Sequence, residues 1–203
     1  MFSAIARSID DATYRRLSVP GLLSSVAPEE ATLERGFNYD YVELGFSAAI
    51  DPFLDLKSVF HVSRDGFEPE EAYADMKQLP SGFAARAGKF LSAFGRENER
   101  HGHSWDFNDR PLVQRAFFGD EGLNDVGVRL TWLAPTALYL LAGFEGFQGE
   151  TSNSFGRDGF CDPNGGVDAG NISGPALATG FIKTSFDVGD AVFLAGVSMA
   201  RGK

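Results

Sequence analysis

The chain has 203 residues, a formal net charge of -10 at pH 7 and one cysteine. The acidic balance excludes a protein that tracks nucleic-acid phosphates, because such binding needs clustered Lys and Arg. The single cysteine excludes an internal disulfide framework and a zinc site built on several thiolates. No run approaches the roughly 20 apolar residues of a membrane-spanning helix, but the alternating strands of a membrane barrel keep mean hydropathy near zero.

Alternation with a period of two dominates the sequence from residue 36 onward, whereas residues 1–35 show none and are expected to form an arm or linker. Within 38–50, apolar residues fall on one face and polar residues on the other. After a turn at Asp51-Pro52 the same pattern continues over about 54–62. The two segments predict a β-hairpin with one apolar and one charged face.

Further strands are predicted along the rest of the chain, and their connections alternate in length. The strands lie around 68–76, 83–91, 128–132, 137–148, 177–187 and 193–200. Short turns alternate with a modest loop at 64–67 and with two long loops, at about 92–125 and 149–176. This alternation places all short turns on one rim, which is typical of outer-membrane barrels. The predicted fold class is therefore all-β: an antiparallel transmembrane β-barrel with about eight strands in this chain and long loops on one rim.

Alternation also fits a soluble β-sandwich or a lipocalin-like barrel that binds a ligand inside. The two alternatives differ in where the charged face of the sheet meets water. In a membrane barrel the charged face lines a water-filled pore, and in a soluble barrel it faces the surrounding solvent. The residues assigned to the charged face are Lys57, Lys89, Arg129 and Lys183, with Glu43, Asp55, Glu71, Asp75 and Glu145.

The two ends of the chain lack the features of a complete exported protein. Residues 1–16 contain no apolar run of the roughly 7–15 residues found in a secretory signal. The C-terminal residues end directly on an alternating segment. We therefore expect the chain to be a piece of a longer protein, with its signal peptide truncated.

Several motifs between residues 79 and 136 resemble a known family. A Leu-Pro-x-Gly turn is followed by a Gly-Lys-Phe strand and by a loop of the form His-x-His-x-Trp-Asp-Phe-x-Asp-x-Pro-Leu. The sequence resembles bacterial outer-membrane proteins labelled zinc-regulated TonB-dependent outer-membrane receptors or porin-like proteins, over about 36–203. The matching residues include Gly88, Lys89, Phe90, Gly95, His101, His103, Trp105, Asp106, Phe107, Asp109, Pro111 and Leu112.

This resemblance implies a location in the bacterial outer membrane, with lipid as a partner, and a barrel that has more strands than this chain. It also implies uptake of a small solute, with a metal ion such as zinc as one candidate. No segment resembles a plug domain or a TonB box. A channel is therefore favoured over an energised receptor, and the sequence gives the TonB system no support as a partner.

The long loop at 92–125 contains more aromatic residues than an exposed loop needs. Irregular backbone at membrane depth is tolerated only inside a barrel, so one prediction is that this loop forms a constriction or partial plug in the lumen. The alternative is an outer loop packed on its neighbours. In the first case Arg110 and Arg115 are expected to pair with Asp106, Asp109 or lumen carboxylates. The residues assigned to the constriction are Trp105, Phe107, Arg110, Arg115, Phe117, Lys57, Glu71 and Arg129.

The same loop holds the candidate metal ligands. His101 and His103 lie on one side of an extended segment, and Asp106 follows them, which permits a zinc site. In the alternative, the two histidines hydrogen-bond within the folded loop and hold Trp105. No Ser or Cys nucleophile has an arranged base, and no phosphate-cradling glycine motif occurs, so we expect no enzymatic activity and no resident cofactor apart from a possible zinc ion. A metal-dependent hydrolase built on the His pair remains the competing enzymatic hypothesis.

Overall fold

A computed structural model describes residues 2–5, 36–39, 41–63, 66–106, 110–119, 121–150 and 176–202. The chain divides into two compact units. The first unit comprises residues 1–44 and 60–68, and the second comprises residues 45–59 and 69–203. Within the described residues, no helix is long and apolar enough to cross a membrane.

The first unit contains a small two-stranded sheet. Strand β1 (Phe2–Ile5) pairs antiparallel with β2 (Gly36–Tyr39). In the same unit, the Tyr41 ring stacks on His61 with ring centroids 4.3 Å apart. Strand β1 lies within the predicted arm, and residues 6–35 lie outside the described residues. The predicted division after residue 35 stays a prediction.

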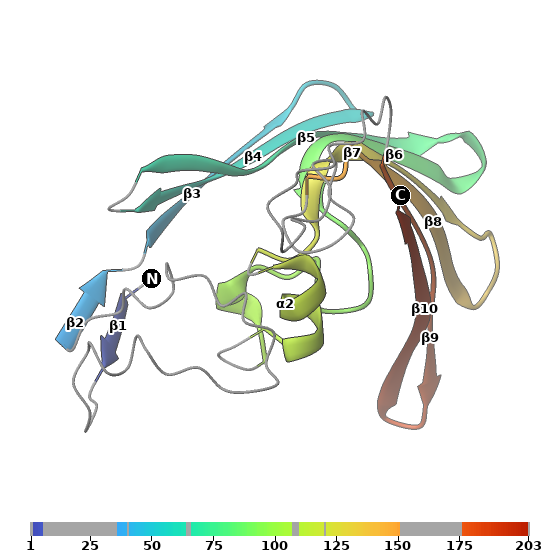
Figure 1. The fold of residues 1–203 in the computed structure, drawn as a ribbon. Helices are drawn as coiled ribbons and strands as arrows, with labels where there is room; N and C mark the ends of the chain where they lie inside the picture. The colour runs from blue at the N-terminus through green and yellow to red at the C-terminus, as the bar shows by residue number, and fades with distance from the viewer. Residues whose placement is uncertain are drawn as a thin grey trace, which may run out of the picture. The chain divides into compact units, whose positions relative to one another are not determined.

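Eight antiparallel strands form one sheet in the order β10-β9-β8-β7-β6-β5-β4-β3 (Figure 1). Each strand therefore pairs with its neighbours along the chain, as in an up-and-down meander. In the described residues β3 and β10 end this order, so the sheet is not closed. The strands are β3 (Tyr41–Ala49), β4 (Leu54–Ser63), β5 (Phe67–Leu79), β6 (Phe83–Leu91), β7 (Asn124–Leu133), β8 (Tyr139–Phe147), β9 (Leu177–Val188) and β10 (Ala191–Gly202).

The all-β antiparallel prediction is confirmed, as are the eight strand positions and the two long connections. The predicted alternation of connection lengths fails at 64–66, because that connection is no longer than the short one at 50–53. Two further details differ from the sequence analysis. Strand β5 continues past the predicted end to Leu79 through a register shift after Met76. The first long connection contains a short turn, η3 (Gly102–Ser104), and a helix, α2 (Leu112–Phe118). A second short turn, η2 (Pro80–Gly82), joins β5 to β6.

One face of the sheet in the second unit is apolar and exposed. On β7, Val126, Val128 and Leu130 are exposed, whereas Asp125 and Arg129, which alternate with them, are buried. Residues paired across neighbouring strands share a face, so the row through Leu130 extends this surface over six strands. That row is Met76, Ala85, Leu130, Phe144, Gly180 and Met199. Phe144 is 60% exposed, so this face is uncovered.

The other face carries charges and is covered. Its corresponding row across β5 to β10 is Asp75, Arg86, Arg129, Glu145, Thr179 and Ala200. Glu145 has no exposed surface. The hydrophobic core lies on this face, where residues of the first long connection meet the sheet. It comprises Tyr73, Phe90, Phe118, Leu123, Phe147 and Leu177.

Two glycines let aromatic rings lie flat on this covered face. A Cβ on Gly127 would come within 2.6 Å of the Phe147 ring, and one on Gly143 within 2.2 Å of the Phe181 ring. In both pairs the ring stands opposite the glycine on the next strand. Some of the 24 glycines of the chain therefore make room for phenylalanine on the neighbouring strand.

Lys89 corrects one face assignment. The sequence analysis placed it among the charges of the polar face, but its partners across the strands are Ala72 and Val126. Val126 belongs to the exposed apolar face, so Lys89 does too. Arg86, Gly88 and Phe90 hold the polar-face positions of β6. The Lys89 ammonium instead donates to the Pro69 carbonyl at 3.0 Å.

Candidate functional site

Residues 92–123 are named the cover segment, and those of them that the structure describes, 92–106, 110–119 and 121–123, lie on the polar face of the sheet. In Figure 1 the helix α2 of this segment stands on the concave side of strands β6 to β10. Polar contacts tie the segment to five strands. They join Ser92 and Ala93 to Glu145, Gly95 to Ser198, Glu99 to Arg129 and Lys183, and His101 to Glu70 and Glu71.

Glu145 anchors the start of the cover segment. One carboxylate oxygen accepts the Ala93 amide at 2.9 Å and the Arg129 Nε at 2.6 Å. The other accepts the hydroxyls of Ser92 and Thr179. Four donors, one of them the cation Arg129, offset the cost of burying this charge. The carboxylate therefore joins β7, β8 and β9 to the cover segment.

Glu99 makes the second connection, from the cover segment to the sheet. Its carboxylate accepts from Arg129 Nη1 at 2.7 Å and from Lys183 Nζ at 3.0 Å. Arg129 also donates to the Leu91 carbonyl at 2.7 Å. Because Arg129 contacts Glu145 and Glu99 together, one guanidinium holds the sheet and the cover segment to each other.

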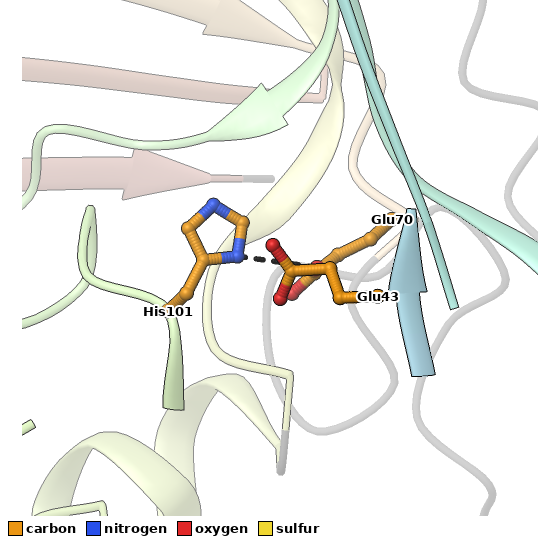
Figure 2. A group of neighbouring side chains, drawn as sticks. All are labelled: Glu43, Glu70 and His101. Atoms are coloured by element: carbon orange, nitrogen blue, oxygen red, sulfur yellow. Dashed lines mark hydrogen bonds and ion pairs between the residues drawn. The ribbon is translucent and has the colours of Figure 1, made fainter. Parts of the chain in front are cut away.

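His101 forms the third connection, at β5. Its Nδ1 lies 3.1 Å from Glu70, a contact drawn in Figure 2, and its Nε2 lies 3.1 Å from Glu71. Carboxylates accept hydrogen bonds, so both ring nitrogens must donate and the ring is an imidazolium. The bonds to Glu70 and then Glu71 raise the pKa of His101 to about 10. Since metal ligation needs a neutral imidazole, a metal would have to displace this proton.

The predicted zinc ligands are only partly brought together. The rings of His101 and His103 stack with centroids 5.8 Å apart. The Asp106 carboxylate is instead held by Arg100 at 2.8 Å, which lowers the pKa of Asp106. In the part of the chain that the structure describes, His101, His103 and Asp106 do not gather their ligand atoms within 4.8 Å of one another. Zinc binding stays a prediction.

The predicted constriction residues in the cover segment contact one another. The Trp105 indole donates to the Arg100 carbonyl at 2.8 Å, and the buried Arg110 guanidinium lies 4.8 Å from the Trp105 ring centroid. Arg110 donates to the Asn98 side chain and to the Glu121 carbonyl. Thus Asp106 pairs with Arg100, where the sequence analysis expected Arg110 or Arg115.

The remaining predicted residues have different placements. Glu71 and Arg129 are buried on the polar face, Lys57 is exposed on β4, and Phe117 is exposed on α2. Phe107 and Asp109 lie outside the described residues, as does the side chain of Arg115.

Sequence reasoning missed Asn98 and Glu99, and also the partner of Asp75. The buried Asn98 amide donates to the Ser92 and Leu123 carbonyls and accepts the Leu123 amide, so it ties the two ends of the cover segment together. Nothing in the sequence marks this Asn within an irregular loop. Arg86 forms a two-point pair with Asp75 at 2.7 and 2.9 Å. Counting from the turn between β5 and β6 does not reveal this pair, because the register shifts by one residue between Met76 and Leu79.

Comparison with known proteins gives one curated relative. The chain is 43% identical over 205 residues to an uncharacterized protein of Aquifex aeolicus (strain VF5). The match covers 100% of this chain but 43% of that relative's length. No family model matches the chain, and no solved structure matches it.

Proposed function

We propose that this chain forms part of the wall of an outer-membrane β-barrel channel, with the cover segment as a constriction on the pore side, through which a small solute passes. The observation that carries the proposal is that the burial of the two faces is the reverse of that in a soluble protein. The apolar face is exposed, and the charged face is covered and fully hydrogen-bonded at Glu145.

A soluble sheet buries its apolar face, because transfer of apolar surface from water is the main favourable term in folding. Large exposed apolar patches mark contact with lipid or with another protein. Here the patch continues to β10, where Val197 is 75% exposed. Membrane barrels show the same order, with apolar residues outward and polar residues inward along every strand.

Aromatic residues near the short turns also support a membrane location. Phe83 and Trp132 pair across β6 and β7 beside the η2 turn, and the Trp132 indole donates to the Ser81 carbonyl at 3.1 Å. Aromatic girdles of this kind border the apolar band of outer-membrane barrels.

The competing hypothesis, a soluble barrel with its ligand inside, needs the apolar face inward. In the described residues of the second unit, side chains from the cover segment, such as those of Ser92, Glu99 and His101, occupy the charged face instead. This arrangement supports the channel. The solute itself, with zinc as one candidate, and any TonB dependence stay predictions.

Two positions on opposite faces of β7 test the proposal. In a Cys161→Ser background, Val128→Cys and Thr131→Cys place one spin label on each face. After folding into lipid vesicles, the label at 128 is expected to collide with oxygen, which concentrates in the bilayer, and to be shielded from a water-soluble nickel reagent. The label at 131 is expected to be shielded from oxygen. A label at 128 that is open to the nickel reagent in folded protein would overturn the proposal.

A further inference from the structure

A hollow of about 350 Å³ lies between the cover segment and the strands β9 and β10. Arg96 and Glu99 of the cover segment line it, and Lys183, Leu194 and Ser198 line it from the sheet. This volume falls within the range of small-molecule sites in proteins. The chain as a whole is acidic, yet this lining gathers cationic side chains.

Several hydrogen-bond donors in the lining of the hollow are not used within the protein. The Arg96 guanidinium forms ion pairs with Glu97 at 3.6 Å and with Asp106 at 3.8 Å, both longer than a hydrogen bond, and no described residue accepts a hydrogen bond from it. Its side chain is 69% exposed, so the fork of five N–H donors is open to a ligand. Lys183 uses one of its three N–H groups on Glu99. The Ser198 oxygen accepts the Gly95 amide, which leaves its hydroxyl proton to donate.

The acceptors of the hollow are already occupied. Glu99 is the acidic residue in its lining, and both of its oxygens are engaged, one by Arg129 and one by Lys183. A ligand that donates hydrogen bonds therefore finds no free carboxylate there, whereas a ligand with acceptor oxygens finds unused donors. A planar carboxylate matches the guanidinium fork in two-point geometry.

The opposite wall is apolar. Leu194 lies on the same face of β10 as Ser198, because the two residues are separated by an even number of positions. Its side chain lines the hollow and has no covering layer in the described residues. A fully hydrated inorganic ion gains nothing from this wall, but an aliphatic group does.

We propose that this hollow binds a small organic acid, with its carboxylate at Arg96 and Lys183 and its aliphatic part against Leu194. The site belongs to the polar face and the cover segment, so it stands whether or not the apolar face lies in lipid. If the channel proposal also holds, the hollow selects the solute at the constriction.

The test uses the folded chain in detergent micelles, labelled with ¹⁵N-glycine, and butyrate as the probe. The amides of Gly95 and Gly196 border the hollow, and that of Gly189 lies in the β9–β10 turn. Butyrate is expected to shift the first two resonances and to leave the third in place. Its dissociation constant is expected to be on the order of 1 mM, as befits a small, partly exposed site.

Matched probes and variants separate the parts of the proposal. Arg96→Gln is expected to weaken butyrate binding about tenfold, the usual size of one charge-assisted hydrogen bond. Leu194→Ala is expected to weaken it as well, whereas Lys89→Gln on the opposite face leaves it unchanged. Absence of shifts, or equal shifts with uncharged butyramide, would overturn the carboxylate site. Equal affinity for sulfate would overturn the role of the apolar wall.

Discussion

The two faces of the sheet in the second unit differ in the burial of their side chains. On the polar face, Glu145 is completely buried and receives hydrogen bonds from four groups. On the apolar face of the same strands, Val128 is 59% exposed. In a soluble domain the hydrophobic effect would cover the second face first. The comparison teaches that this sheet leaves its apolar face exposed and covers its charged face, and each prediction below tests one of the two faces.

The largest effect is expected from removing the cation beneath the cover segment. Arg129→Met leaves Glu145 buried without its ion-pair partner, which costs about 3–5 kcal/mol for comparable buried pairs. Urea unfolding of the protein folded in lipid vesicles measures this loss. Lys89→Met, on the other face, serves as the control and is expected to have little effect. A loss below about 1 kcal/mol would show that Arg129 is solvated.

The second prediction tests the exposed apolar face. Val128→Arg is expected to cost about 2–4 kcal/mol in lipid vesicles if this position lies near the bilayer midplane. On a water-exposed surface the same change would stay within about 0.5 kcal/mol. The same unfolding assay therefore separates the two environments of one side chain. An unchanged stability would contradict the lipid-facing assignment.

The third prediction concerns the imidazolium at β5. His101→Gln removes two hydrogen bonds to charged carboxylates. A well-buried hydrogen bond of this kind contributes about 1.5–3 kcal/mol to stability. We expect a smaller contribution here, because the His101 ring is partly exposed. The folded pKa of about 10 lies above the ordinary value of 6.5, so the stabilisation is complete below pH 6.5 and is lost as the pH rises through 10.

Hydrogen exchange along the cover segment measures this pH dependence. Charged groups facing the ring are Glu70 and Glu71 from β5, with His103 stacked beside it. The wild-type protein is expected to lose protection of this segment between pH 9 and 11, and the His101→Gln variant is expected to lack that step. A loss of protection near pH 6.5 in the wild type would mean that the two carboxylates do not hold the proton.

The smallest effect is expected at Glu99. This carboxylate bridges Arg129 and Lys183, but it is 36% exposed, so water screens the pair. Glu99→Gln is expected to lower the free energy of unfolding by less than about 1 kcal/mol. A cost as large as that of Arg129→Met would show that Glu99, and not Glu145, fixes the cover segment.

The sequence predicted the strands well and the cover segment poorly, for a physical reason. Alternation records which residues share a face, so β7 could be read from Val128, Arg129 and Leu130 alone. The contacts of the cover segment join residues far apart in the chain, such as Gly95 and Ser198, and no local pattern encodes them. Lys89 was placed on the wrong face because its charge was given more weight than its position among outward residues.

For the candidate site, too, local sequence patterns were predictive and long-range contacts were not. Aromatic content identified 92–125 as a folded loop, and its packing on the polar face agrees with that reading. The histidine pair suggested zinc, because sequence spacing cannot show that His101 meets two carboxylates from β5. Those acids lie 31 and 30 residues away from it in the chain.

The two native tryptophans offer the most direct test of the central claim. Trp132 lies on the apolar face, in the row with Phe83 and Ile182, and Trp105 lies in the cover segment. Trp105→Phe and Trp132→Phe each leave a single fluorophore in protein folded into vesicles with brominated acyl chains. The account predicts strong quenching of Trp132 and none of Trp105. Equal quenching of both, or quenching of Trp105 alone, would contradict it.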